Sequence, residues 1–209
     1  MLDDYGFNLW ANGYDKSVEV SDENNAYPFA GYKKVLNAIY GTVMKHSPAS
    51  ILDIGIGTGT LSAKLYDGGN WITGIDFSEK MLEKSQAKIP NATLMQFDFS
   101  KGLPPALASE KFDFIISTYA FHHLTNDEKI CFIKSLLNNL NDYGSILIGD
   151  ISFPDIVALE ECKKASGNDW DDDEHYFVFS ESSKLLRAFC MASFHQYSHC
   201  GGVLEIKKF

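Results

Sequence analysis

The chain has 209 residues, of which 45% are hydrophobic and 22% charged, a composition typical of one folded globular domain. Its 28 acidic and 18 basic residues give a net charge of −10 without a basic stripe, which argues against DNA or RNA as a partner. No apolar run approaches the roughly 20 residues that a membrane-spanning helix needs, and the first ten residues are acidic where a secretory signal would be basic. With four scattered cysteines and no CxxC pair, we expect a cytoplasmic protein without membrane contact.

Short apolar runs alternate with longer amphipathic segments along most of the chain. We expect two helices over residues 7–17 and 28–46, joined by the polar residues 21–26, to form a cap over one end of a sheet. The apolar runs predict strands over residues 50–54, 70–76, 92–98, 111–118 and 145–151. The segments between them predict helices over residues 58–66, 78–88 and 125–140, followed by a turn over 141–144.

The end of the chain departs from this alternation. Residues 193–199 and 203–209, on either side of Cys200-Gly201-Gly202, predict a β-hairpin, so at least one strand must run against the others. Strands separated by helices predict an α/β fold with a Rossmann-like, doubly wound and mostly parallel sheet. We expect a single domain over residues 1–209, with the helical cap in 1–46 and the Rossmann-like core in 47–209.

Three alternating glycines stand between a predicted strand and a predicted helix, in residues 53–60 (DIGIGTGT). Glycine permits a sharp turn and lets a ligand lie against bare backbone, while the helix N-terminus adds free N–H groups. The spacing GxGxG differs from the dinucleotide fingerprint GxGxxG, since Thr60 stands at its sixth position, and this weakens the case for NAD. A ligand without a pyrophosphate fits the tighter turn, and a structural turn without any ligand is the alternative.

Acidic residues end the next two predicted strands. Asp76 ends the second strand and Asp98 ends the third. The carboxyl ends of parallel strands meet at one crevice, where a carboxylate accepts hydrogen bonds from ribose hydroxyls or from an exocyclic adenine amine. For either aspartate alone, a helix cap or a turn is an equal alternative, but three suitable strand ends in succession favour a nucleoside-containing ligand.

These segments resemble class I S-adenosylmethionine (SAM)-dependent methyltransferases over nearly the whole chain. DIGIGTGTL resembles the glycine-rich first motif of that family, GIDFSEKML its second, QFDF its third, and FDFIISTYAFHHL its fourth strand with the segment that follows. LWANGYD resembles the WAxxYD-type cap of the small-molecule branch, and STYAFHHLTNDEK resembles one group of little-studied small bacterial methyltransferases. The resemblance implies a seven-stranded sheet in the order 3-2-1-4-5-7-6 with strand 7 antiparallel, SAM as cofactor and S-adenosylhomocysteine as product.

The resemblance also implies roles for individual residues. The cofactor-binding residues that it implies are Asp53, Gly55, Gly57, Gly59, Asp76, Asp98 and Thr118. The glycines would line the methionine part of SAM, and the first aspartate would order that turn or reach the amino group through water. Asp76 would hold the ribose, Asp98 the adenine amine, and Thr118 would contact the cofactor through its backbone.

The candidate catalytic residues follow from the chemistry of methyl transfer. A sulfonium is an activated leaving group, so alignment and exclusion of water are the main tasks, and a general base helps only where the acceptor must lose a proton. His122 and His123, which follow the fourth strand, are the candidates, with packing and turn capping as the alternative. The resemblance also implies that Tyr14 closes over the methyl group from the cap. As a base it is the less favoured candidate, because a phenol titrates near pH 10 and is protonated at neutral pH.

We expect no bound metal ion. His195, His199 and Cys200 are the group that suggests one, but strand residues four apart lie about 13 Å from each other. The acidic residues 169–174 (DWDDDE) are typical of a solvated loop, with a metal or a cationic substrate as the alternative.

Two other functions remain compatible with the motifs. An NAD-dependent oxidoreductase would need a longer glycine loop and a catalytic Tyr–Lys pair, which we do not find. A non-catalytic SAM-binding sensor or accessory protein would carry the same cofactor motifs. We favour a methyltransferase that acts on a small-molecule acceptor, is a monomer or homodimer, and has no nucleic-acid or membrane partner.

Overall fold

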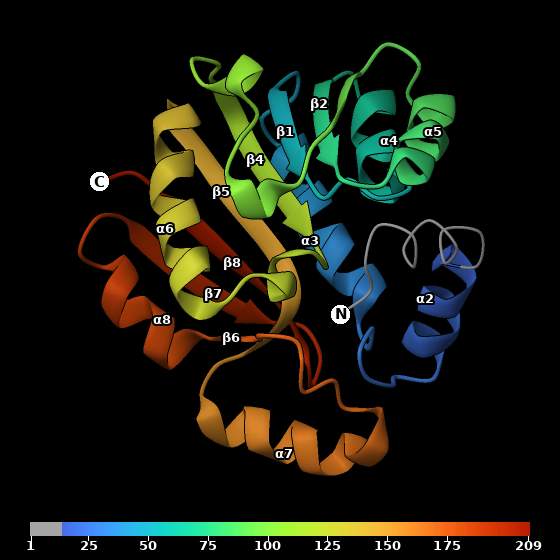
Figure 1. The fold of residues 1–209 in the computed structure, drawn as a ribbon, viewed down its shortest axis with the longest axis vertical. Helices are drawn as coiled ribbons and strands as arrows, with labels where there is room; N and C mark the ends of the chain where they lie inside the picture. The colour runs from blue at the N-terminus through green and yellow to red at the C-terminus, as the bar shows by residue number, and fades with distance from the viewer. Residues whose placement is uncertain (1–13) are drawn as a thin grey trace.

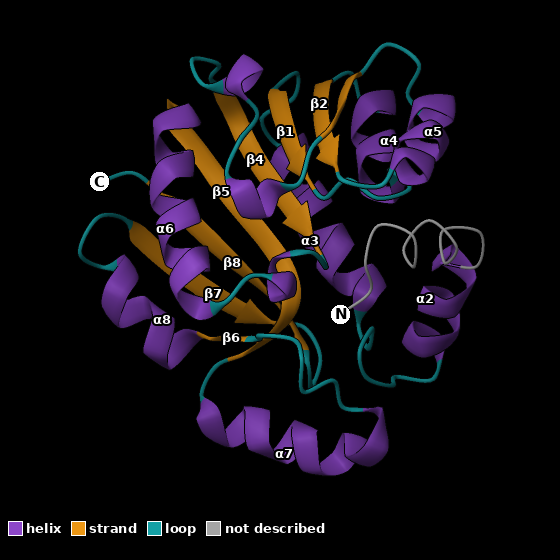
Figure 2. Ribbon diagram, viewed as in Figure 1, coloured by secondary structure: helices purple, strands orange, loops and turns teal. Residues whose placement is uncertain are grey.

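A sheet with helices on both faces forms the centre of the computed structural model, which describes residues 14–209 and their side chains from Lys16 onward (Figures 1 and 2). The strands are β1 (Ser50–Ile54), β2 (Trp71–Asp76), β3 (Thr93–Gln96), β4 (Phe112–Thr118), β5 (Leu140–Phe153), β6 (Phe177–Val178), β7 (Met191–Gln196) and β8 (Gly201–Lys207). Among the described residues, seven of them follow the order β3-β2-β1-β4-β5-β8-β7, and β6 pairs with the end of β5.

Helices connect the strands and cover the sheet. The α-helices are α2 (Tyr14–Glu23), α3 (Tyr32–Met44), α4 (Thr60–Asp67), α5 (Glu79–Lys88), α6 (Asn126–Leu136), α7 (Ile156–Ser166) and α8 (Phe179–Leu186). The short 3-10 turns are η1 (Phe99–Lys101), η2 (Pro105–Leu107), η3 (Phe121–His123), η4 (Leu137–Asn139) and η5 (Gly167–Asp169). Helices α3, α4 and α5 pack on one face of the sheet and α6 and α8 on the other, while α7 lies beyond the end of β5 (Figure 2).

Strand β1 shows why the central strands are apolar on both sides. Ile51 packs into the core cluster beneath α3 and α4, whereas the next residue, Leu52, packs into the cluster beneath α6 and α8. Both side chains are fully buried. Successive side chains of a strand point to opposite faces, so a strand with helices on both sides is apolar at every position rather than at alternate ones.

The sheet confirms the expected Rossmann-like order. Strands β1 to β5 pair in parallel, whereas β8 runs antiparallel to both β5 and β7. If the short strand β6 is left out, β7 and β8 become the sixth and seventh strands in chain order. The sheet then has the order 3-2-1-4-5-7-6 with an antiparallel seventh strand. The predicted hairpin is therefore present, although its strands begin earlier than expected, and Gly201 and Gly202 belong to β8 rather than to the turn.

Other boundaries differ from the expectations in ways that tertiary contacts explain. Helix α2 extends to Glu23, into the stretch expected to be a polar connection, and residues 7–13 of the expected first helix lie outside the described residues. Residues 141–144 do not form a turn but a register irregularity inside β5, because β4 pairs with this strand on both sides of them. Residues 152–192, to which the sequence assigned no element, contain α7, β6 and α8.

The start of α6 is encoded locally. Thr125 accepts a hydrogen bond from the backbone N–H of Glu128, and the Glu128 carboxylate accepts one from the backbone N–H of Thr125. This reciprocal capping box satisfies N–H groups that the first turn of a helix leaves without intrahelical partners. It fixes the point at which η3 ends and α6 begins. Within residues 14–209, no helix combines the length and apolar character needed to cross a membrane.

Two glycines predict opposite effects of an added methyl group. At Gly149 in β5, a Cβ would lie 2.5 Å from Cγ1 of Val35 on α3, so Gly149→Ala should lower the free energy of unfolding by about 1–3 kcal/mol. At Gly41 in α3, no atom lies within 4 Å of a Cβ, so Gly41→Ala should raise it by about 0.5–1 kcal/mol. Urea unfolding measures both variants. A Gly149→Ala protein as stable as the wild type would contradict the close packing of α3 on β5.

Candidate functional site

The glycine loop between β1 and α4 lies at the edge where the carboxyl ends of β1, β2 and β4 meet. Gly55, Gly57 and Gly59 have φ angles of +69°, +55° and +72°, a region that residues with a side chain rarely adopt. A Cβ at Gly55 would lie 2.6 Å from the Cβ of Ala120, so the loop packs directly against the segment after β4. A Cβ at Gly57 would meet only the carbonyl oxygen of Gly55, at 4.0 Å, so this backbone borders open space.

Asp53 brings a buried carboxylate to this open space. Its Oδ2 accepts a hydrogen bond of 2.6 Å from Ser62, while its Oδ1 has no hydrogen-bond partner among the described residues. The side chain is 2% exposed, and burial raises its pKa to about 7. It lines a small cavity of about 30 Å³, whose other walls are Tyr32, Gly55, Ile56, Gly57, Thr58, Thr60, Leu61 and Thr118. An unpartnered oxygen at a cavity is suited to a cationic ligand group.

Asp76 joins the glycine loop to the next helix. Its Oδ2 accepts a hydrogen bond of 2.8 Å from the N–H of Gly57, and its Oδ1 accepts one of 2.9 Å from the N–H of Ser78, the N-cap of α5. Burial raises its pKa above the ordinary value, while these two bonds act in the opposite direction. Each carboxylate oxygen has a second lone pair, so a ligand hydroxyl can still bind here.

Two other predicted cofactor residues lie at the same edge of the sheet. Asp98 caps η1, where its Oδ1 accepts hydrogen bonds from the backbone N–H and the hydroxyl of Ser100, and its Oδ2 lies 3.0 Å from Nζ of Lys101. Burial alone would raise the pKa of Asp98, but the bonds from Ser100 and Lys101 lower it. Thr118 ends β4 and lines the glycine-loop cavity. The side chain of Tyr14 lies outside the described residues.

His122 is held rigidly by the end of β5. Asp150 accepts a hydrogen bond of 2.9 Å from the backbone N–H of His122 through Oδ2, and its Oδ1 lies 2.6 Å from Nδ1 of the ring. Both residues are buried. Burial alone would lower the pKa of His122, but the Asp150 carboxylate raises it above the ordinary value.

Glu174 completes a cluster with the two histidines. Its Oε1 lies 3.5 Å from Nε2 of His122 and 4.0 Å from Nδ1 of His123, and its Oε2 accepts a hydrogen bond of 3.0 Å from the hydroxyl of Tyr176. The two imidazole centroids lie 4.2 Å apart. Burial, together with His122, lowers the pKa of His123 to about 3. The structure therefore brings the predicted pair of histidines together and adds a carboxylate to them.

Lys129 of α6 supplies a buried cation beside this cluster. Its ammonium group donates to the carbonyl oxygen of His175 and lies 4.9 Å from the ring centroid of Phe177. The side chain is almost fully buried, and this burial lowers its pKa to about 8 against the attraction of Asp150 and Glu174.

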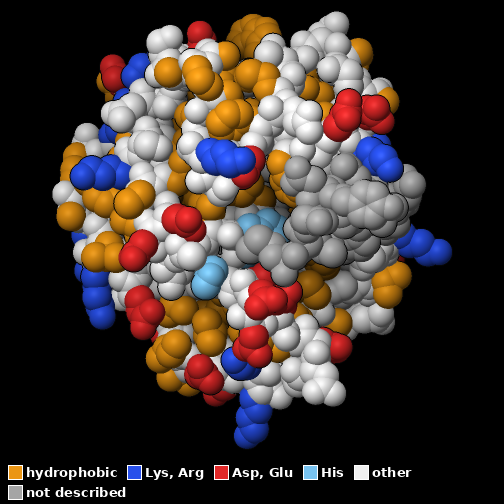
Figure 3. Space-filling view, viewed as in Figure 1, with side chains coloured by type: hydrophobic (Ala, Val, Ile, Leu, Met, Phe, Trp, Pro, Cys, Tyr) orange, Lys and Arg blue, Asp and Glu red, His pale blue; other side chains and the backbone are white. Residues whose placement is uncertain are grey.

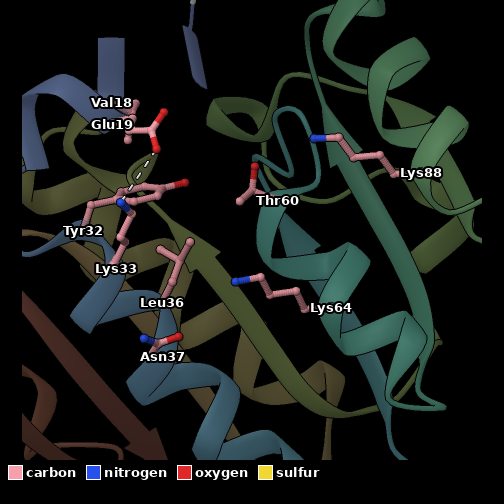
Figure 4. A pocket seen from close by; sticks show the side chains of 9 residues that line it. All are labelled: Val18, Glu19, Tyr32, Lys33, Leu36, Asn37, Thr60, Lys64 and Lys88. Carbon is pink, nitrogen blue, oxygen red and sulfur yellow. Dashed lines mark ion pairs between the residues drawn. The ribbon is translucent and has the colours of Figure 1, made fainter. Parts of the chain in front are cut away.

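A larger cavity, of about 440 Å³, separates helices α2 and α3 from α4 and α5 (Figure 4). It shares Tyr32 and Thr60 with the glycine-loop cavity. Its other walls are Val18, Glu19, Lys33, Leu36, Asn37, Lys64 and Lys88. Lys64 and Lys88 point from α4 and α5 toward the cap helices, and Lys33 lies 3.9 Å from Glu19 (Figure 4). This cavity is therefore locally basic in a chain whose net charge is −10.

The sequence patterns do not single out Asp150, Lys129 or Glu174 as site residues. Asp150 carries the same signal as Asp76, an acid close to the end of a predicted strand. Lys129 interrupts the apolar stripe of α6, three and four residues before the buried Phe132 and Ile133. Glu174 lies in the run 169–174, read as a solvated loop, and its partly buried side chain could not be told from its exposed neighbours by composition.

The comparisons with known proteins agree on one family. Residues 51–144 match the family model described as a methyltransferase domain. An uncharacterized methyltransferase of Geobacillus sp. (strain WCH70) is 35% identical over an alignment of 190 positions, which covers 87% of this chain and 85% of the relative. Another, from Geobacillus kaustophilus, is 34% identical over an alignment of 211 positions, which covers 97% of this chain and 95% of the relative.

Solved structures share the fold at lower identity. A SAM-dependent methyltransferase from Clostridium acetobutylicum has a TM-score of 0.70 and 16% identity, and the match covers 93% of this chain and 98% of that one. Magnesium protoporphyrin IX methyltransferase from Synechocystis, solved with bound SAM, has a TM-score of 0.67 and 18% identity, covering 100% of this chain and 99% of that one.

Because the carboxylate of Asp53 is buried, we expect that replacing it with a neutral side chain raises the free energy of unfolding by an amount that depends on pH. Because the pKa of Asp53 is about 7 in the folded protein and lower in the unfolded chain, its contribution to stability is lost as pH rises through 7. Asp53→Asn should therefore raise the free energy of unfolding by about 1 kcal/mol or more at pH 8, and by less at pH 5. Urea unfolding at the two pH values measures the difference.

Asp113→Asn is the matched control. Burial alone would raise the pKa of Asp113, but hydrogen bonds from Ser50 and Asn141 lower it, so its neutralisation should reduce stability at pH 8. Equal stability of Asp53→Asn and the wild type at both pH values would show that Asp53 carries no buried charge.

Proposed function

This chain belongs to the class I SAM-dependent methyltransferases, and we propose that it transfers the methyl group to a small-molecule acceptor. The observation that carries the proposal is the glycine loop, where positive φ angles, the open space at Gly57 and the unpartnered Oδ1 of Asp53 coincide. A turn with only a structural role would have no need of a buried carboxylate that raises the free energy of the folded state.

We assign the residues at the carboxyl ends of the strands to the methionine, ribose and adenine parts of SAM. In this proposal the backbone of Gly55, Gly57 and Gly59 borders the methionine part, and Oδ1 of Asp53 receives its ammonium group directly or through water. Asp76 holds the ribose hydroxyls with its remaining lone pairs, while it keeps its bonds to the loop and to α5. Asp98 accepts from the adenine amine, and Thr118 contributes its backbone.

The cavity between the cap helices and α4 supports a small acceptor. Its volume of about 440 Å³ lies within the range of small-molecule sites, and it shares two walls, Tyr32 and Thr60, with the glycine-loop cavity. Three lysines and one glutamate line this cavity, so an acceptor with an anionic group is favoured. In this proposal the reaction takes place in the cytoplasm, where four free cysteines would remain reduced.

The work of the protein in this reaction is alignment. When bound, the sulfonium of SAM supplies an activated methyl group. The hydrogen bond from the N–H of Gly57 to Asp76 holds the loop, and the contact between Gly55 and Ala120 holds the segment after β4. The cofactor and the acceptor would therefore meet at a fixed distance. Helix α2 lies across the larger cavity from α4 (Figure 4), and its closure over that cavity would exclude water.

Asp76→Ala should weaken SAM binding at least tenfold. The variant loses the proposed ribose contact and also the bond that orders Gly57, and a tenfold change corresponds to about 1.4 kcal/mol. Calorimetric titration with SAM and S-adenosylhomocysteine measures both dissociation constants, which should be micromolar for the wild type. Asp67→Ala, an exposed acid at the end of α4, is the matched control and should bind like the wild type.

Folding of each variant is checked by circular dichroism, with NAD as the control ligand. An unchanged dissociation constant in a folded Asp76→Ala protein would reject the ribose assignment. Binding of NAD but of neither SAM nor its product by the wild type would reject the proposed cofactor site.

A further inference from the structure

The cluster of His122, His123 and Glu174 offers three metal-ligating side chains at one point. One ligand atom from each lies within 4.8 Å of the other two. We propose that these residues bind a divalent metal ion of the zinc type through Nε2 of His122, Nδ1 of His123 and Oε1 of Glu174. The proposed cofactor site does not use the paired histidines after β4 or the acid at the end of the run 169–174, and this cluster contains both.

Two of the three distances between the ligand atoms are close to those around such an ion, and the third lies within 4.8 Å. Zinc bonds to histidine nitrogen and carboxylate oxygen are about 2.0–2.2 Å long, so neighbouring ligands in a tetrahedral site lie about 3.3–3.5 Å apart. Glu174 Oε1 lies 3.5 Å from Nε2 of His122 and 4.0 Å from Nδ1 of His123. A shift of a few tenths of an ångström brings the second pair to the required separation.

The surroundings orient two of the three ligands. Asp150 holds Nδ1 of His122, which leaves Nε2 turned toward Glu174, and a carboxylate on the second ring nitrogen is the usual partner of a metal-binding histidine. Tyr176 donates to Oε2 of Glu174 and leaves Oε1 toward the histidines. The N–H of His175 donates to the carbonyl of His122 at 2.9 Å, which ties the Glu174 loop to η3.

The balance of charge also favours a cation. Two carboxylates lie in the cluster, the buried Asp150 and the largely buried Glu174. Beside them, the ammonium group of Lys129 supplies one buried positive charge. Buried carboxylates are stable where cations compensate them, and a divalent ion would do so between Glu174 and the two imidazoles. Figure 3 shows histidine surface near the centre of the viewed face, with acidic side chains close to it.

Three protein ligands leave a fourth position of the ion for water or for a ligand. Because Ala120 packs on Gly55 and η3 follows directly, the site stands beside the cofactor loop. If the proposed function is right, on which this step rests, an acceptor oxygen, nitrogen or sulfur atom bound at that position would lose its proton to solvent more readily. Its lone pair then forms the bond to the methyl carbon, while the C–S electron pair stays on sulfur. This replaces the expected general-base role of His122 and His123.

The test is a metal titration of the full chain after treatment with a chelator. Calorimetry with Zn²⁺ should show one site with a micromolar or tighter dissociation constant. Glu174→Gln and His123→Gln each remove one ligand and should weaken binding by more than about 100-fold, beyond the 10- to 100-fold loss typical of an outer partner. Asp172→Asn removes a charge from the same acidic run, at an exposed position paired with Lys163, and should bind like the wild type.

A second group, Cys162, His199 and Cys200, requires a control because its ligand atoms also lie within 4.8 Å of one another. Co²⁺ in place of Zn²⁺ distinguishes the two, since thiolate ligands add an intense near-ultraviolet band that nitrogen and oxygen ligands lack. A visible Co²⁺ spectrum without that band, abolished in Glu174→Gln, supports the proposal. Absence of binding, a thiolate band, or equal Zn²⁺ affinity in both folded variants would overturn it.

SAM affinity, measured on the same samples, separates this proposal from the proposed function. Wild-type protein that binds SAM but not Zn²⁺ would overturn the metal site alone. Protein that binds Zn²⁺ through these residues but not SAM would keep the metal site and overturn the cofactor site.

Discussion

The carboxylate of Asp76 is the contact on which the cofactor edge of this fold depends. It ends β2 and receives N–H groups from the glycine loop after β1 and from the first turn of α5, so one side chain fixes three elements. Ser85 of α5 adds a second bond to the loop, from its hydroxyl to the carbonyl of Gly57 at 2.7 Å. Without these bonds, a loop with three glycines would sample many conformations, since glycine loses more freedom on folding than any other residue.

Asp150 has the corresponding role in the second half of the sheet. It lies near the end of β5 and accepts hydrogen bonds from the backbone N–H groups of His122 and Ile151, while it also holds the imidazole ring of His122. Each half of the doubly wound sheet thus has an aspartate near a strand end that orders the neighbouring loop. The first loop forms the proposed cofactor site, and the second presents the histidines to Glu174.

The glycine loop and the cluster around His122 both keep buried charge, and this lowers the stability of the folded protein. Asp53 retains a carboxylate that burial disfavours, and the cluster around His122 buries ionisable groups where apolar side chains would fold at lower cost. Charge of this kind persists in proteins where binding or chemistry requires it. Cationic groups, the ammonium of SAM at Asp53 and the proposed ion at Glu174, would relieve this cost at each place.

The sequence by itself determined the glycine loop, the position of Asp76 and the central strands, because these depend on local patterns: apolar runs of strand length, turn residues and an acid at a strand end. The strand order was implied only by the resemblance to the methyltransferase family, and the tertiary structure confirms it. The sequence did not determine the helices between Ser152 and Ala192, where the apolar residues form no clear period and packing on β5 decides the structure. Only the tertiary structure decided that Glu174 meets His122 and His123, because a loop distant in the chain reaches η3 through the bond between His175 and His122. Local patterns carry no information on such pairing, which follows from the packing of α7 and β6 against the end of β5.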